Sequence, residues 1–265
     1  MGETISAVLL DLDETILYDE LATEAAFSAT ATHAAEIAAV DPGCLIVAVQ
    51  EEARALWLEG PDPAWCDDIG TSEVEGLRAR FEGNDPRTVA MRAWGPGFRS
   101  ESWKRALRRC GIDDDMLASE LDARFEQERV STNPFIPGVE ETLDQLEERY
   151  RLAIVTNGLP DVQREKLVRT GLMDRFDVVV ISGELGFGKP DRRMYDETVR
   201  QLRLIAGECV MVGDNFRRDV AGAQEAGIRG VWISCGKDLP DTDVTPFLVV
   251  ESLAELPSKL ASCRG

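Results

Sequence analysis

The chain has 265 residues and a formal net charge of −20 at pH 7, and its apolar fraction is that of a globular protein. A surface this negative repels nucleic acid and anionic membranes, so neither is an expected partner, whereas a small anion could still bind at a locally positive site. No stretch reaches the roughly 18 apolar residues of a membrane span, and the first residues do not have the pattern of a signal peptide.

Six cysteines are scattered along the chain without a C-x-x-C pair: Cys44, Cys66, Cys110, Cys209, Cys235 and Cys263. This spacing argues against a zinc site and predicts reduced thiols and a cytoplasmic location. The one histidine, His33, lies in an Ala-rich stretch with helical spacing, where we interpret it as a packing or surface residue.

The first predicted element is a buried strand at residues 5–10, a short apolar run with β-branched residues. Residues 18–136 then show helical spacing and no clear strand. Two stretches inside this span, at residues 59–70 and 92–100, are rich in Gly and Pro and are interpreted as linkers.

From residue 138 onward, predicted helices alternate with predicted strands. The strands are expected at residues 151–156, 177–182, 209–214 and 229–234, and a last short strand and helix are expected within 246–260. Regular alternation of this kind predicts an α/β fold, in which a parallel sheet is covered by helices on both faces.

The two patterns together predict two domains. A Rossmann-like catalytic core is expected from residues 1–17 and 137–265, and an all-helical cap domain from residues 18–136. The second boundary carries two prolines and a glycine within residues 133–138, as is typical of a segment that joins domains.

Polar residues follow four of the predicted strands. They are Asp11, Asp13 and Thr15 after the first strand, Thr156 and Asn157 after the second, Lys189 after the third, and Asp214 and Asp219 after the fourth. Because ligands of an open parallel sheet collect at the carboxyl ends of its strands, we expect these side chains to form one site. Carboxylates this close raise each other's pKa unless a cation lies among them, and Mg²⁺ prefers such oxygen ligands.

The stretches "DLDET", "TNG", "GKP" and "GDNFRRD", in this order, resemble the four motifs of the haloacid dehalogenase superfamily of phosphohydrolases. The helical insert is similar in position to the helical cap of that family. The run from "TNG" to "GDNFRRD" looks most like the branch of N-acylneuraminate-9-phosphatases and pyrimidine nucleotidases. The resemblance implies a Mg²⁺-dependent phosphatase that hydrolyses a small phosphorylated metabolite, a sugar phosphate or a nucleoside monophosphate, through an aspartyl-phosphate.

The resemblance also assigns catalytic and metal-binding roles. It implies that Asp11 is the nucleophile and that Asp13 is the general acid and base. It further implies that Mg²⁺ is bound by the side chains of Asp11 and Asp214 and by the backbone carbonyl of Asp13, which leaves the Asp13 carboxylate free for proton transfer.

The remaining motif residues are expected to hold the phosphoryl group. Thr156 and Asn157 would donate hydrogen bonds to its oxygens, and Lys189 would supply positive charge. Thr15 and Asp219 are expected in supporting positions, where Asp219 would orient Lys189 or a metal-bound water.

Substrate choice is expected to depend on the cap, because the core handles only the phosphoryl end. Aromatic and basic residues near the linkers are the candidates: Trp57, Trp65, Arg92, Trp94, Phe98 and Arg99. For each of them, helix packing or a solvated surface is the more common role.

Other activities of the same superfamily stay open. Asp13 argues against a haloacid dehalogenase, which does not use a second Asp, whereas a sugar phosphomutase shares all the core motifs. Phosphonate cleavage would need a cap lysine, and Lys104 lies far from the first motif. A non-catalytic binding or regulatory member is a further alternative. The leaving group and the choice between monomer and homodimer are not determined by the sequence.

Overall fold

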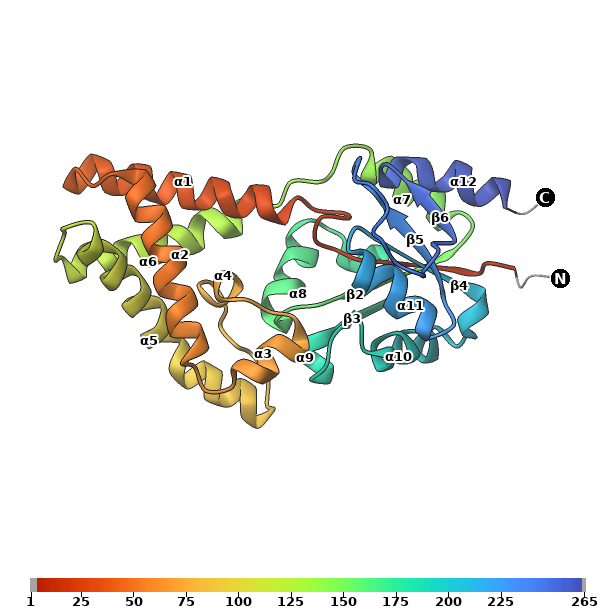
Figure 1. Cartoon of the computed structure of the whole chain (residues 1–265), viewed down its shortest axis with the longest axis horizontal. Coiled ribbons are helices and arrows are strands. Elements are labelled where there is room, and N and C mark those ends of the chain that lie inside the picture. Colours follow the sequence, from red (N-terminus) through yellow and green to blue (C-terminus); the bar gives the residue numbers. More distant parts are fainter. Residues whose placement is uncertain (1–3, 264–265) are drawn as a thin grey trace. The chain divides into compact units, whose positions relative to one another are not determined.

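The structure of the protein is a computed structural model that describes residues 4–263 and consists of two compact units (Figure 1). The sheet unit comprises Met1–Tyr18, Pro134–Asn157 and Leu167–Gly265, and the helical unit comprises Asp19–Asn133 and Gly158–Lys166. Residues 1–3 and 264–265, which the predicted core includes, lie outside the described residues.

The sheet unit contains, within residues 4–263, one six-stranded parallel sheet with the strand order β3-β2-β1-β4-β5-β6. The strands are β1 (Ala7–Leu10), β2 (Arg151–Thr156), β3 (Val178–Ile181), β4 (Cys209–Gly213), β5 (Arg229–Ile233) and β6 (Leu248–Val250). The strand order reverses between β1 and β4, and ligands of such sheets bind beyond the strand ends at this point. The predicted α/β fold with a parallel, Rossmann-like sheet is confirmed.

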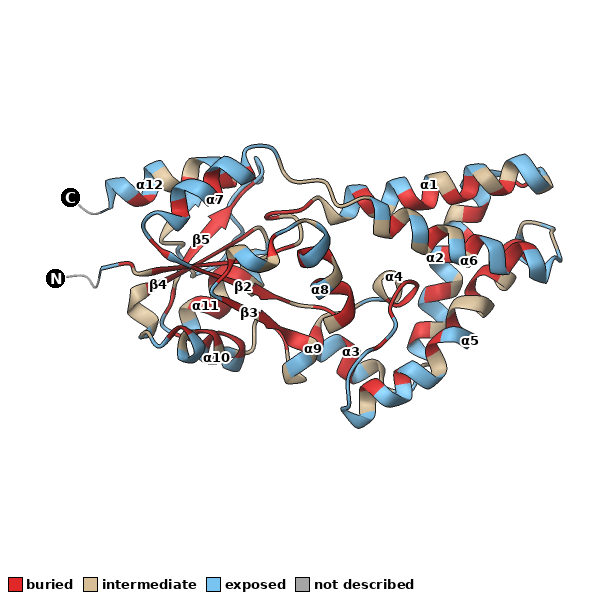
Figure 2. Ribbon diagram, turned by 180° about the vertical axis from the view of Figure 1, so that it is seen from behind, coloured by how far each residue is buried: buried red, intermediate tan, exposed pale blue. Residues whose placement is uncertain are grey.

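Both faces of the sheet are buried, which explains why β1 is apolar throughout. Val8 and Leu10 pack in one cluster with α7 (Val139–Glu147) and α12 (Leu256–Ser262), whereas Ala7 and Leu9 pack in another with α10 (Arg192–Leu202) and α11 (Gly222–Glu225). Alternate residues of a strand point to opposite faces, so a strand covered on both sides needs apolar residues at every position. Figure 2 shows the central strands in the colour of buried residues.

The helical unit is built around its own apolar core. Its helices are α1 (Asp19–Ala38), α2 (Pro42–Leu58), α3 (Pro63–Ile69), α4 (Glu73–Gly76), α5 (Pro86–Arg109), α6 (Asp115–Ser131) and the first part of α8 (Pro160–Arg169). Three of them begin at an Asp-Pro pair, where Asp41, Asp62 and Asp85 accept hydrogen bonds from first-turn N–H groups at 2.7, 3.0 and 2.9 Å. Proline at the next position fixes a helical φ and lacks an N–H that would have no partner there.

The interpretation of residues 59–70 and 92–100 as linkers is wrong in large part. Residues 63–69 form α3, and residues 92–100 lie inside α5 together with Pro96. A proline inside a helix costs about 3 kcal/mol, so tertiary packing has to outweigh it here. Gly95 shows this packing, because a Cβ atom at this position would lie only 2.6 Å from the ring of Phe81.

The start of α8 belongs to the helical unit, although the strand–helix alternation places it in the predicted core. Glu75 Oε1 accepts a hydrogen bond from the Leu159 N–H at 2.7 Å, and Asp161 Oδ2 accepts one from the Arg80 N–H at 2.6 Å. These contacts join residues more than 80 positions apart in the sequence, so no local pattern could reveal them.

Cys44 and Cys110 form a disulfide, so the prediction of reduced thiols is wrong for this pair. Cys44 lies near the start of α2 and Cys110 directly follows α5, and the two Cα atoms are 6.3 Å apart. The two cysteines are 66 positions apart in the sequence, so only the packing of α2 against α5 brings them together. Cys66, Cys209, Cys235 and Cys263 are free.

We expect Cys44→Ser to lower the free energy of unfolding by about 3–4 kcal/mol, because the disulfide closes a long loop and restricts the unfolded chain. Urea denaturation of both proteins without reductant measures the difference. Cys263→Ser, which removes an exposed free cysteine, is the control and should leave the stability unchanged. Equal stability of wild type and Cys44→Ser would contradict the expectation.

Candidate active site at the carboxyl ends of the strands

Asp11 is the first residue beyond β1, at the centre of the sheet. Its N–H donates to the Val212 carbonyl at 3.0 Å, which continues the pairing of β1 with β4 by one residue. Its Oδ1 atom accepts a hydrogen bond from the Leu12 N–H at 2.8 Å. The side chain of Asp11 is 14 % exposed, so it reaches the surface of the sheet unit at the end of a buried strand.

The residues after Asp11 form a tight loop. The N–H groups of Ile16 and Leu17 donate to the Leu12 carbonyl at 2.9 and 3.1 Å, and these three side chains are buried. Asp13 is half-buried and pairs through its backbone with Leu17. These backbone contacts therefore hold the Asp13 backbone in a defined position directly after Asp11. Thr15 is 1 % exposed, and its hydroxyl has no hydrogen-bond partner among the described residues.

Lys189 lies between two carboxylates of the sheet unit. Its Nζ atom is 2.9 Å from Asp11 Oδ1 and 2.6 Å from Asp219 Oδ1, and the residue is 3 % exposed. Burial opposes the charged form of Lys189, but Asp11 and Asp219 outweigh it and raise the pKa of the ammonium group above its ordinary value. The site thus holds a fixed positive charge beside Asp11.

Asp219 is fully buried and is carried by a π-helix, Phe216–Ala221. Its Oδ2 atom accepts a hydrogen bond from the Asn215 N–H at 3.0 Å, so each of its carboxylate oxygens has a partner. A Cβ atom on Gly213 would lie 2.2 Å from the same oxygen, so only glycine fits at the end of β4. A single π-turn is rare, and it often marks a functional position.

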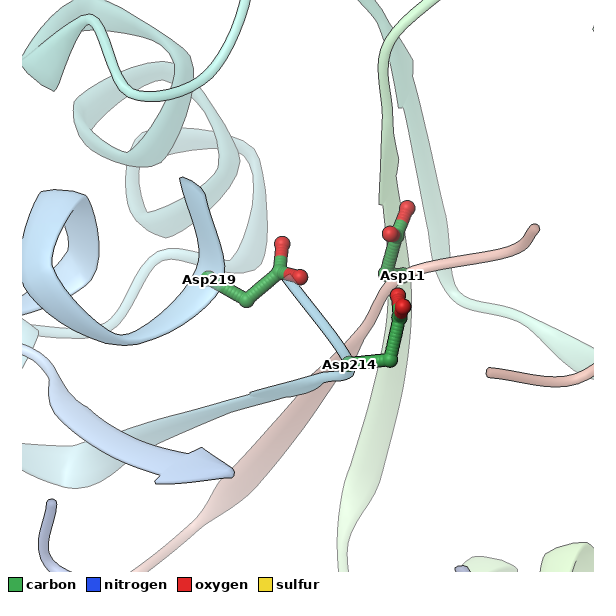
Figure 3. A group of neighbouring side chains, drawn as sticks. All are labelled: Asp11, Asp214 and Asp219. Carbon is green, nitrogen blue, oxygen red and sulfur yellow. The ribbon is translucent and has the colours of Figure 1, made fainter. Parts of the chain in front are cut away.

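Asp11, Asp214 and Asp219 offer one carboxylate oxygen each within 4.8 Å of one another. Figure 3 shows the three side chains, which come from the ends of β1 and β4 and from the π-helix. Burial raises the pKa of Asp214, and the charge of Asp11 raises it further. The indole N–H of Trp232 donates to the Asp214 carbonyl at 3.0 Å and so fixes its backbone.

These donors suit Mg²⁺. Three carboxylates lie close together, and one ammonium group contacts two of them, Asp11 and Asp219, so negative charge is in excess. Hard oxygen ligands of this kind are those that Mg²⁺ prefers. The structure brings Asp219 into the predicted cluster of Asp11 and Asp214. The carboxylate of Asp13 is not part of this cluster in the described chain, and only its backbone carbonyl was expected to bind the metal.

Asn157 holds the backbone of Lys189. Its Nδ2 atom donates to the Lys189 carbonyl at 2.9 Å, and its Oδ1 atom accepts from the Lys189 N–H at 2.7 Å. A Cβ atom on Gly188 would come within 2.9 Å of the amide, so the contact is close on this side too. The predicted amide donor to a phosphoryl oxygen is thus engaged with Lys189. Thr156 is buried, and its hydroxyl donates to the Asn157 carbonyl at 3.3 Å.

The six residues proposed to select substrate all have packing or structural contacts in the helical unit. Trp57, Trp65 and Phe98 are buried in its core, and Trp94 stacks on Phe98 with the ring centroids 4.6 Å apart.

The two arginines of this set close a loop of the helical unit. Arg92 donates to the carbonyls of Phe81 and Gly83, and Arg99 donates to the Ala79 carbonyl at 2.7 Å. The sequence analysis gave a role outside substrate binding, in packing or at the surface, as the more common one for each of these six residues, and the contacts seen here are structural.

The model of the haloacid dehalogenase-like hydrolases matches residues 5–227 of the chain. The protein belongs to this family. It is 36 % identical over 250 residues to the phosphoserine phosphatase of Thermus thermophilus, which covers 94 % of this chain and 96 % of that one. It is 32 % identical to the N-acylneuraminate-9-phosphatase of Rattus norvegicus, over 62 % of this chain and 68 % of the relative. The pyrimidine 5'-nucleotidase YjjG of Escherichia coli is 29 % identical over 61 % of this chain and 69 % of its own length.

A solved structure gives the same family. The 2-haloacid dehalogenase from Pseudomonas syringae pv. Tomato superposes with a TM-score of 0.64 at 26 % identity, over 98 % of this chain and 100 % of that one. The predicted membership of this hydrolase superfamily is therefore confirmed, and the similar relatives include the two kinds of phosphatase that the motifs suggested. In the described part of the chain, none of the helices has the length and apolar composition needed to cross a membrane.

We expect Asn157→Ala to lower kcat/KM for an aryl phosphate about 30-fold, because two hydrogen bonds of about 1 kcal/mol each no longer fix Lys189. The measurement is a double-mutant cycle with Lys189→Met. If Asn157 acts only through Lys189, adding Asn157→Ala to Lys189→Met causes little further loss.

Gly188→Ala provides an independent check, because its new Cβ atom would displace the Asn157 amide and should cause a similar loss. Additive losses in the cycle would show instead that Asn157 contacts the phosphoryl group directly, as the sequence predicts.

Asp122 in α6 gives the helical unit a pH-dependent stability. Burial raises its pKa from 3.8 to about 6, Arg99 opposes this shift and Glu126 adds to it. One of its oxygens, Oδ1, is buried without a hydrogen-bond partner in the described chain. The folded state thus binds this proton more tightly than the unfolded state. The protonated carboxyl group therefore contributes its full stability to the fold below about pH 4, and this stability is lost as the pH rises through about 6.

We therefore expect Asp122→Asn to unfold with a free energy about 2–3 kcal/mol above that of wild type at pH 7, and with no advantage near pH 4. Denaturant titrations at several pH values measure this difference. Glu24→Gln changes an exposed carboxylate of α1 in the same unit and should show no such pH-dependent gain. An Asp122→Asn advantage that stays constant with pH would rule out this titration.

Proposed function

We propose that the protein is a Mg²⁺-dependent phosphoric monoester hydrolase that acts on a small phosphorylated metabolite through an aspartyl-phosphate on Asp11. The observation that carries the proposal is the contact of Lys189 with both Asp11 and Asp219 at the carboxyl end of β1. A carboxylate that would act as the nucleophile therefore lies beside a buried positive charge. The names of the similar phosphatases support this chemistry.

Asp11 would attack phosphorus in line with the leaving oxygen, and Asp13 would give a proton to that oxygen. A water molecule in the same in-line position would then lose a proton to Asp13 and hydrolyse the aspartyl-phosphate. Lys189 would neutralise the phosphoryl oxygens in both steps, and the Thr156 hydroxyl would turn from the Asn157 carbonyl to donate to them. Asp219 and Asn157 would keep Lys189 in place.

Mg²⁺ would be held by the side chains of Asp11 and Asp214 and by the Asp13 carbonyl. When bound, it would shield Asp11 from the phosphate and stabilise the charge of the transition state.

We further propose that the helical unit is a cap domain that selects the leaving group of the substrate. A phosphate monoester of a sugar, a nucleoside or an amino acid fits the range of similar phosphatases. The cytoplasmic location stays a prediction from the sequence.

We expect Asp11→Asn to abolish phosphate release. We expect Asp13→Asn to lower its rate about 10²- to 10⁴-fold, the usual contribution of general acid–base catalysis. The loss in Asp13→Asn should be smaller for aryl phosphates, whose leaving groups need less protonation. Steady-state kinetics with an aryl and an alkyl phosphate measure both effects. Near-wild-type activity of Asp11→Asn, or turnover of a 2-haloacid without phosphate release from any ester, would overturn the proposal.

We expect a chelator to stop phosphate release and Mg²⁺ to restore it. Ca²⁺ should support less turnover, because it accepts more ligands at longer distances and can draw a second oxygen of Asp11 away from phosphorus. Activity assays after dialysis against chelator, with each metal added back, measure this. Full activity in chelator, or a strict need for Zn²⁺, would contradict it.

A further inference from the structure

The helical unit contains a cluster of buried cations that none of the catalytic motifs includes. Arg78 follows α4, Arg129 lies in the last turn of α6, and Lys166 lies on α8. The side chain of each is 3 % exposed. Buried charges of one sign need partners of opposite charge, because removing each charged group from water costs roughly several kcal/mol.

Two carboxylates are shared among these cations. Asp19 Oδ1 lies 2.6 Å from Arg129 Nη2 and 2.8 Å from Lys166 Nζ, and Glu165 pairs with Arg78 and Arg80. The two carboxylates are the exposed part of the cluster, because the side chains of Asp19 and Glu165 are 27 % and 17 % exposed.

The two guanidinium groups belong to one cluster, because Arg78 contacts Glu165, and Arg129 shares Asp19 with Lys166, the next residue along α8. Burial lowers the pKa of Arg78, and the charge of Arg129 lowers it further. Each group also has one buried nitrogen, Nη1, with no hydrogen-bond partner in the described chain. A buried N–H without a partner costs about 1–3 kcal/mol, and more when the group is charged.

We propose that Arg78 and Arg129 form a binding site for a small oxyanion, a carboxylate or a phosphate group, inside the helical unit. The two unpartnered Nη1 atoms are donors on planar forks, whose geometry matches the oxygens of such an anion. The anion would also offset the repulsion between the two arginines. The site includes none of the catalytic-motif residues and goes beyond the proposed phosphatase activity.

Sulfate is the probe, because it is an oxyanion that cannot be hydrolysed. Calorimetric titration is carried out in chelator on the full chain with Lys189→Met, which removes the buried cation of the sheet unit. We expect one equivalent of sulfate to bind. Adding Arg129→Lys keeps the charge but removes the fork, and should weaken binding about tenfold, a change of about 1.4 kcal/mol.

Arg105→Lys is the matched control, because Arg105 is a half-exposed arginine of the same unit with a local partner, Glu101. It should leave sulfate binding unchanged. Arg78→Lys tests the other half of the site and replaces Arg129→Lys if circular dichroism shows that variant to be unfolded. No sulfate binding to the Lys189→Met protein, or equal binding after either lysine substitution, would show that the cluster only anchors α8.

A second experiment identifies the source of the oxyanion. Only this experiment rests on the proposed phosphatase activity. O-phosphoserine and O-phosphoethanolamine differ only in a carboxylate. If the site takes a carboxylate of the substrate, Arg129→Lys lowers kcat/KM for O-phosphoserine about tenfold more than for O-phosphoethanolamine. An equal change for both, with rates that depend on added sulfate, identifies a free anion. Failure of both esters to react would overturn the proposed substrates and leave the sulfate result intact.

Discussion

The ammonium group of Lys189 is held between Asp11 and Asp219, and much of the sheet unit serves to keep it there. A buried lysine would lose its proton without such partners, because burial favours the neutral amine. The partners must in turn be fixed. Asp219 depends on the π-helix and on the lack of a side chain at Gly213, and the Lys189 backbone depends on the amide of Asn157.

The same arrangement leaves the site short of positive charge. Asp11, Asp214 and Asp219 lie close together, and Lys189 contacts only Asp11 and Asp219 among them. Burial raises the pKa of all three carboxyl groups. A divalent cation would remove this conflict, because it favours the ionised form of every carboxylate that binds it. The electrostatics of the site and the proposed metal-dependent chemistry therefore agree.

The helical unit uses its charged residues in a different way. Arg92 and Arg99 donate to backbone carbonyls of residues 79–83, a stretch without regular secondary structure whose backbone needs such partners. Asp41, Asp62 and Asp85 cap helices. Charged side chains in this unit thus complete the backbone hydrogen bonding, and the buried pair of Arg78 and Arg129 stands out because its donors are not all used.

The sequence by itself determined the α/β class, the strands of the sheet and the family, because strand periodicity and the four short motifs are local patterns. It also predicted that Asp11, Lys189, Asp214 and Asp219 lie together, since parallel strands bring their carboxyl ends to one edge. Only the tertiary structure decided what depends on contacts between distant residues. These are the pairing of Cys44 with Cys110, the place of the start of α8 in the helical unit, and the helix that continues through Pro96. The tertiary structure also decided the two hydrogen bonds between the Asn157 amide and the Lys189 backbone. A turn motif shows which side chains lie near a strand end, but not which backbone groups they bind.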